Sequence, residues 1–212
     1  MTFLTFLRDC ASYPNGNKIG DWRTPIHMAE IFISYIHEQE IVAKAVKDFL
    51  ETLVFPPTQV FISSDQRQIR AGDNWLQKIV EGLREAKVVI LLLSEMSIAR
   101  PWVNFEAGAA WLSDKHVIPV CFKGLSKGNL PKPYSDLQSL NLNDEIDRYR
   151  LLSSVCGHLG RHPKTIGPPP NVIAKLAGIT ANYDPKVAPY LRFAEIVKAF
   201  EKADQYPFDH QS

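Results

Sequence analysis

Short apolar runs alternate with amphipathic segments through the middle of the chain. The runs at 31–33, 60–62 and 88–93 have the length of buried strands. Between them, residues 38–53 and 75–87 carry apolar side chains at three- and four-residue spacing, which predicts helices with one buried face. Strands that alternate with helices predict an α/β fold with a parallel sheet and helices on both of its faces.

The second half of the chain continues this alternation. Pro101 suits the first turn of a helix that we expect over 101–114. A fourth strand is expected over 117–122, toward an edge of the sheet, because Pro119 has no N–H to donate to a neighbouring strand. The last elements expected in this part are a short strand over 139–142 and a helix over 144–159.

The two ends of the chain differ from this middle part. Residues 1–28 are expected to form an N-terminal leader segment, with a short apolar patch followed by turn residues. Residues 29–160 are expected to form the main domain. Within a C-terminal region of 161–212, residues 161–184 contain many Pro and Gly and are expected to be irregular. An amphipathic helix over about 188–203 is expected to lie on or beside the domain.

Composition limits the kinds of partner. The 212 residues are 45% hydrophobic and 22% charged, with a net charge of +1, which is typical of a globular domain and gives no electrostatic case for nucleic acid or an anionic membrane. No apolar stretch has the length of a membrane span. Cys10, Cys121 and Cys156 are far apart and form neither a metal-ligand pair nor a disulfide framework, so a cytoplasmic location is expected.

One carboxylate stands out in the helix expected to begin at Pro101. Glu106 is the only charged residue in the segment 101–112, and Trp102 lies four residues earlier on the same helical face. A lone acid in an apolar helix is costly to bury unless it has a partner or a task. The alternative is structural: a partly exposed Glu106 paired with a nearby base such as Arg100 or Lys115.

The predicted topology places other polar residues near Glu106. In open parallel sheets, ligands bind beyond the carboxyl ends of the strands. The segments expected at that edge are 34–38, 63–75 and 94–102. We therefore expect ligand contacts from Ser34, Tyr35, Ile36, His37 and Trp102. His158 and His162 have no third ligand nearby in the sequence, so no metal site is expected.

The ordered set of motifs resembles that of a Toll/interleukin-receptor (TIR) domain over roughly 29–160. The first strand resembles the first conserved box of the family, the second strand and its loop resemble the BB loop, and the third strand precedes a helix like that bearing the catalytic glutamate. The residues that carry the resemblance are 31–35, 60–65, Ile69, Gly72, Trp75, 88–94, Trp102 and Glu106. The segments 104–111 and 117–120 resemble prokaryotic members.

This resemblance implies a flavodoxin-like fold with a five-stranded parallel sheet. It also implies an enzymatic activity on NAD+. NAD-consuming members release nicotinamide from NAD+, which is a substrate and not a cofactor, and form ADP-ribose or a cyclic isomer. The resemblance implies that Glu106 is catalytic and that Asp65, Ile69, Gly72 and Trp75 belong to a loop used in self-association. It also implies a role in bacterial anti-phage defence, with a possible downstream effector that responds to the product. The chain departs from the pattern at 36–38, where such enzymes often carry basic residues.

The implied chemistry needs only one carboxylate. The nicotinamide of NAD+ is already cationic and leaves as a neutral base, so no general acid is required, unlike in ordinary glycoside hydrolysis. Glu106 can hold ribose hydroxyls and stabilise the oxocarbenium charge. Two other functions stay open at this point: a non-catalytic TIR module that only self-associates, and an enzyme like a nucleoside deoxyribosyltransferase. The choice between hydrolysis and cyclisation is also open.

Overall fold

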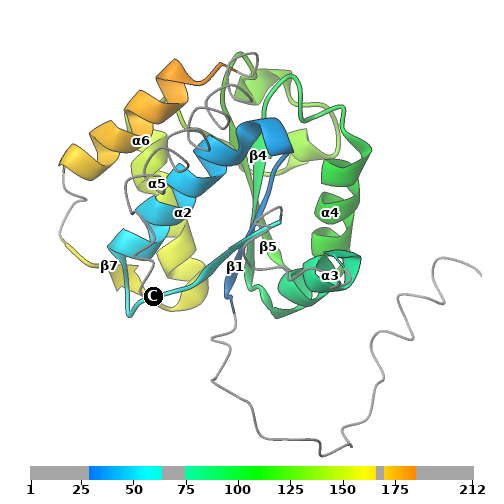
Figure 1. The fold of residues 1–212 in the computed structure, drawn as a ribbon, viewed down its shortest axis with the longest axis horizontal. Helices are drawn as coiled ribbons and strands as arrows, with labels where there is room; N and C mark the ends of the chain where they lie inside the picture. Colours follow the sequence, from blue (N-terminus) through cyan, green and yellow to red (C-terminus); the bar gives the residue numbers. More distant parts are fainter. Residues whose placement is uncertain (1–28, 64–74, 166–169, 185–212) are drawn as a thin grey trace, which may run out of the picture.

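The structure is a computed structural model that describes residues 29–63, 75–165 and 170–184. Its strands and longer helices alternate along the chain (Figure 1). The elements are β1 (Ile31–Ser34), η1 (His37–Gln39), α2 (Glu40–Leu53), β2 (Val54–Phe55), β3 (Val60–Ile62), α3 (Trp75–Glu85), β4 (Val88–Leu93), α4 (Pro101–Leu112), β5 (His116–Cys121), η3 (Lys127–Asn129), η4 (Tyr134–Asp136), β6 (Leu140–Asn141), α5 (Glu145–Leu159), β7 (His162–Pro163) and α6 (Pro170–Asn182).

Some expectations fall on residues outside the described ranges. These are the leader at 1–28, the helix at 188–203, and the loop residues Asp65, Ile69 and Gly72. None of the helices formed by the described residues is both long and apolar enough to cross a membrane.

The predicted parallel sheet is confirmed. Five strands pair in the order β3-β1-β4-β5-β6, and every pairing between them is parallel. β4 lies at the centre, and its six residues are all fully covered, as expected for an apolar strand with helices on both faces. The flavodoxin-like α/β fold expected from the sequence is therefore the observed one.

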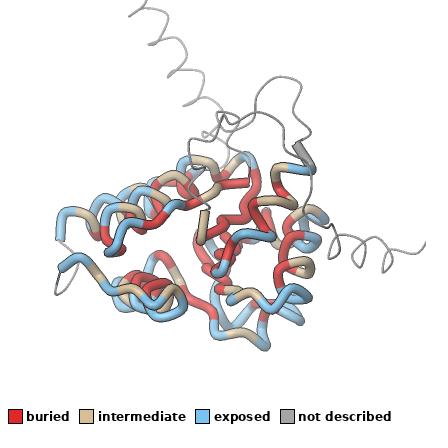
Figure 2. Tube along the Cα trace, turned by 90° about the horizontal axis from the view of Figure 1, so that it is seen from below, coloured by how far each residue is buried: buried red, intermediate tan, exposed pale blue. Residues whose placement is uncertain are grey.

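Two helical layers cover the sheet. Successive residues along a strand point to opposite faces, so Ile31 and Ile33 contact the core shared with α2, α5 and α6, whereas Phe32 contacts the core shared with α3 and α4. Figure 1 shows α2, α5 and α6 on one side of the strands and α3 and α4 on the other. Figure 2 shows the buried residues gathered in the sheet and on the inward faces of the helices.

Pro119 lies where the sequence suggested, near one edge of the sheet. Its strand β5 is the fourth of five, and only the two-residue β6 lies beyond it. β6 pairs with Val120 and Cys121, after the proline. β6 does not pair with Pro119 and therefore does not require the N–H that this residue lacks.

The expectation that 161–184 is irregular was wrong over α6. This helix begins at Pro170, the last of three consecutive prolines, and buries Ile173, Leu176 and Thr180. Proline is tolerated in the first turn of a helix because the N–H it lacks has no partner there. α6 lies along α2 and also contacts α5, so this segment completes one helical layer of the domain (Figure 1).

A small second sheet was not expected. β2 follows α2 directly and pairs antiparallel with β7, so that Val54 faces Pro163 and Phe55 faces His162. The rings of Phe55 and His162 lie 5.3 Å apart. The pair joins the end of α2 to the chain that leads from α5 toward α6.

Candidate active site

The candidate site is built on α4, which starts close to the carboxyl end of β4. Pro101 occupies the first turn of α4, and its preceding residue Arg100 is extended. α4 is apolar or small over most of its surface and buries Val103, Ala107 and Ala110 against the sheet. Glu106 lies on this buried side, in the middle of the helix.

The Glu106 carboxylate is completely buried and accepts a hydrogen bond on each oxygen. Its side chain has 0% exposure. Ser34, the last residue of β1, donates its hydroxyl to Oε2. The Trp102 indole donates Nε1–H to Oε1 over 2.8 Å. The two donors come from the sheet and from the preceding turn of the same helix, so they fix the carboxylate from two directions.

No cation among the described residues pairs with Glu106. Arg100 instead pairs with Glu38 at 2.9 Å, and Lys115 donates to the backbone carbonyl of Arg84 at 2.7 Å. The structural alternative, a partly exposed Glu106 paired with Arg100 or Lys115, is therefore wrong. Glu106 is a buried acid held by two neutral donors.

This environment changes the acidity of Glu106. Burial raises the pKa of the Glu106 carboxyl group from its ordinary value of 4.5 to about 7, against the opposing effect of the hydrogen bonds from Ser34 and Trp102. The group therefore changes charge near neutral pH. A shifted carboxyl group in a defined polar setting is characteristic of functional sites.

A buried polar network that the sequence analysis missed lies at the same edge of the sheet. Gln39 is fully buried and donates Nε2–H to Ser94 Oγ over 2.7 Å. The backbone N–H of Ser94 donates to Ser97 Oγ over 2.8 Å. The available signal was Ser94 directly after the buried strand β4, with Ser97 three residues later. Gln39 gave none, because it lies between acidic residues at the start of an amphipathic helix.

The structure separates the other expected contact residues from one another. Tyr35 is buried in the core shared with α2, on the sheet face opposite α4. Ile36 is buried in the core on the α4 side. His37 is exposed at the start of η1. Trp75, which was expected in the loop used for self-association, is the first residue of α3. Of the residues expected to contact a ligand, only Ser34 and Trp102 hydrogen-bond to Glu106 in the described structure.

The topology explains why these groups meet. The strand order β3-β1-β4-β5-β6 reverses direction between β1 and β4, because the chain adds strands to one side of β1 and then to the other. In doubly wound sheets, the crevice for ligands lies at such a switch point, beyond the carboxyl ends of the strands. Ser34 ends β1, and Ser94 follows β4. No cluster of three or more potential metal-binding side chains occurs within 29–63, 75–165 and 170–184.

The fold agrees with the comparison to known families. A family model described as "TIR domain" matches residues 31–153, which is more than half of the 212 residues. The chain therefore belongs to the TIR domain family. No curated protein matches it.

Among solved structures, the chain is similar to a metazoan TIR-STING receptor from C. gigas. In the complex of that receptor with 2′,3′-cGAMP, the match has 23% identity and a TM-score of 0.49, and covers 65% of this chain and 42% of the receptor. A second structure of the receptor matches with 23% identity and a TM-score of 0.46, over 62% of this chain and 42% of the receptor. The chain thus spans less than half the length of these structures.

The buried acid predicts a pH-dependent stability. Between pH 4.5 and 7, the unfolded chain loses the Glu106 proton while the folded chain keeps it, so the free energy of unfolding falls as pH rises. By pH 8 this loss amounts to about 3 kcal/mol. Glu106→Gln removes the titration and still offers an oxygen to Trp102 and an amide to Ser34. We expect this variant to be more stable than the wild type at pH 8 and to lose most of that advantage near pH 4.5.

Urea unfolding over pH 4.5–8 measures this difference. Glu85→Gln, at an exposed position on α3, is the matched control and should change the free energy of unfolding by less than about 0.5 kcal/mol at any pH. A Glu106→Gln effect that is the same at both ends of the pH range contradicts the raised pKa.

Proposed function

We propose that this TIR-domain protein cleaves the nicotinamide–ribose bond of NAD+, with Glu106 as the catalytic residue. The observation that carries the proposal is the burial of Glu106, with no cation partner among the described residues, at the topological switch point of the sheet. Keeping an acid there costs folding free energy, because burial disfavours its charged form. A purely structural role gives no reason for that cost.

The carboxylate suits this reaction. As the bond from the anomeric carbon to the nicotinamide nitrogen breaks, the bonding electrons leave with the nicotinamide, which becomes neutral. Positive charge passes to the ribose as an oxocarbenium ion. An ionised Glu106 in a dry site stabilises that developing charge more than water does. Water then supplies the hydroxyl group and releases a proton, or a nucleophilic group of the same molecule closes a cyclic product.

The two donors on Glu106 show how a ribose can bind. In the free protein, the Ser34 hydroxyl and the Trp102 N–H each occupy one carboxylate oxygen. A ribose presents two neighbouring hydroxyl groups, which are donors of the same kind. When these hydroxyls replace one or both protein donors, the carboxylate stays satisfied while it approaches the anomeric carbon.

The Trp102 side chain must move aside for a substrate to reach Glu106 by this route. It is only partly buried, and its ring lies 5.4 Å from that of Phe105, which is 37% exposed. Together they form an aromatic pair that reaches the surface beside the acid. An aromatic face attracts a cationic ring, which favours the pyridinium of NAD+ over a neutral nucleobase.

Self-association is a second part of the proposal. On α4, Phe105, Trp111 and Leu112 are large apolar residues that are 37%, 46% and 76% exposed. Trp111 is therefore not a residue of the core. Exposed apolar residues gathered on one helix favour a protein interface. A non-catalytic TIR module needs this surface but not the buried acid.

The biological setting is proposed from the resemblance to prokaryotic members. It comprises a cytoplasmic protein, a role in bacterial anti-phage defence, and a downstream effector that responds to the nucleotide product. Membership of the TIR domain family also favours NAD+ over the deoxynucleoside substrate of a deoxyribosyltransferase-like enzyme.

Loss of the acid should abolish the reaction. We expect Glu106→Gln to lower nicotinamide release from NAD+ at least about 100-fold, because it removes the charge that stabilises the oxocarbenium ion. Mass spectrometry of the products measures both nicotinamide and the ADP-ribose species, and Glu85→Gln should keep wild-type activity. Full activity in Glu106→Gln rejects the assignment. Release of a base from deoxynucleosides, with NAD+ untouched, supports the deoxyribosyltransferase-like alternative.

The reaction should follow the ionisation of Glu106. We expect kcat/KM of the wild type to rise with pH through about 7, because the ionised form is the active one. Ser34→Ala removes a donor that lowers the pKa of Glu106, so its profile should move to higher pH. The measurement is kcat/KM for NAD+ from pH 5.5 to 9. A rate that falls across this range in the wild type contradicts a carboxylate that acts in its charged form.

Assembly should depend on the exposed side of α4. We expect Leu112→Lys to shift the protein toward smaller species in sedimentation velocity, because a charge there opposes burial in an interface. Ile146→Lys, at a 65% exposed position on α5, is the control. In the wild type, specific NAD+ cleavage should increase with protein concentration. Identical sedimentation of Leu112→Lys and the wild type excludes α4 from the interface.

A further inference from the structure

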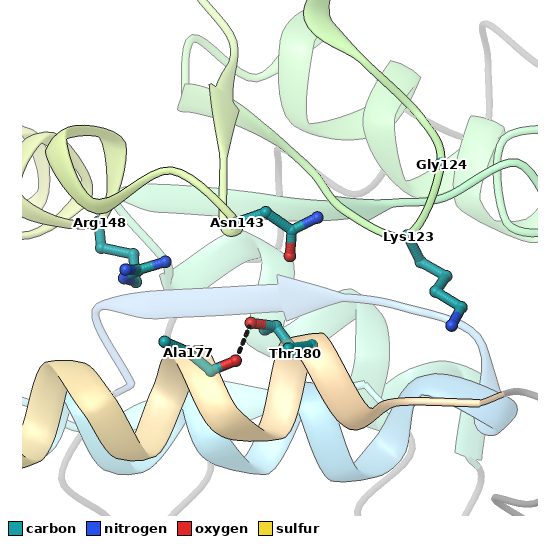
Figure 3. Close-up of a pocket in the computed structure, with 7 residues that line it drawn as sticks. Lys123, Gly124, Asn143, Arg148, Ala177 and Thr180 are labelled. Carbon is teal, nitrogen blue, oxygen red and sulfur yellow. Dashed lines mark hydrogen bonds between the residues drawn. The ribbon is translucent and has the colours of Figure 1, made fainter.

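A cavity lies on the face of the sheet opposite Glu106. It has a volume of about 390 Å³, which lies within the range of small-molecule sites. Its lining comes from three parts of the chain: Lys123 and Gly124 after β5, Asn143 and Arg148 around the start of α5, and α6 residues that include Ala177 and Thr180. Figure 3 shows these side chains arranged around the space above α6.

Arg148 is the unusual member of this lining. Its side chain is only 6% exposed. One of its terminal nitrogens donates to the carbonyl of Leu142 over 2.6 Å. Its Nε is buried and has no hydrogen-bond partner among the described residues. A guanidinium has five N–H donors and keeps its charge in proteins, so a buried one normally has an anion beside it.

Three acids lie within four residues of Arg148 in the sequence. Glu145 is exposed, and no ion pair between described residues joins it to Arg148, whereas Asp147 and Asp144 are engaged elsewhere. Asp147 accepts from Lys127 at 2.7 Å and from the backbone N–H of Asn141 at 2.9 Å. Asp144 accepts from the backbone N–H of Asp147 and caps α5. Glu95 lies against Gly124 but is not among the residues that line the cavity. No ion pair between described residues includes Arg148.

The second charge of the cavity comes from Lys123. Lys123 and Gly124 have φ values of 47° and 84°, so the chain turns sharply after β5 and presents the lysine at the cavity. Asn143 adds an amide that can donate to an oxygen. The lining therefore combines two positive charges and an amide with no carboxylate. This charge matches a doubly charged phosphate better than a single carboxylate.

We propose that this cavity binds the phosphate group of a small phosphorylated molecule, with Arg148 and Lys123 as the anion-binding groups. The volume of the cavity leaves room for more than a phosphate group, so the expected ligand is a phosphorylated metabolite of about mononucleotide size. α6 forms one side of the cavity. This helix lies outside residues 31–153, which the TIR family model matches. The site is separate from Glu106 and does not depend on the reaction proposed there.

Isothermal titration calorimetry of the full chain tests this site. The probes are inorganic phosphate and AMP, with adenosine and succinate as the uncharged and carboxylate counterparts. We expect phosphate and AMP to bind and adenosine not to bind. Arg148→Met and Lys123→Asn should each weaken AMP binding about tenfold or more, because each removes a charged hydrogen-bond donor. Asparagine is chosen because it tolerates the positive φ of position 123.

Controls separate this site from the surface and from Glu106. Arg150→Met removes a 60% exposed arginine from the same helix and should leave AMP binding unchanged. Glu106→Gln should bind AMP like the wild type even where it no longer cleaves NAD+. Equal AMP binding by the wild type, Arg148→Met and Lys123→Asn overturns the proposal, as does tighter binding of succinate than of phosphate. If Arg148→Met does not fold, Lys123→Asn decides the outcome.

Discussion

The contact of the Glu106 carboxylate with the Ser34 hydroxyl and the Trp102 indole is the interaction on which the functional interpretation depends. It joins α4 to the end of β1 through a group that is otherwise expensive to bury. Neutral donors lower that cost without removing the tendency of the acid to hold its proton. The site therefore contains a carboxyl group whose charge a substrate or a small change in pH can alter, which a tight ion pair with arginine would prevent.

The sheet positions this contact by its strand order. Placing β1 beside β4 brings the end of the first strand next to the segment that leads into α4, although more than seventy residues separate Ser34 from Glu106. The buried network of Gln39, Ser94 and Ser97 stabilises the same edge through side-chain and backbone hydrogen bonds. Local sequence sets the helices and strands, whereas the site depends on how the sheet orders them.

Much of this arrangement follows from periodicity and chemistry in the sequence. The apolar run of β4 predicted a central strand, and the four-residue spacing of Trp102 and Glu106 predicted that both lie on one face of a helix. Two parts could not be predicted for physical reasons. α6 was missed because Pro168–Pro170 reads as a break, although a proline is compatible with a first helical turn. Arg148 gave no signal because its isolation depends on the distant α6 and on carboxylates engaged elsewhere.

Burying a charged group costs free energy, and Glu106 and Arg148 differ in how this cost can be reduced. Each is a buried ionisable group without an opposite charge among its described partners. A carboxyl group avoids the cost of a buried charge by binding a proton, and burial raises the pKa of Glu106 to about 7. A guanidinium cannot become neutral in this way, because it does not lose its proton in proteins. Glu106 can therefore be buried in its neutral form below pH 7, whereas Arg148 stays a buried charge that the anion proposed for the neighbouring cavity would compensate.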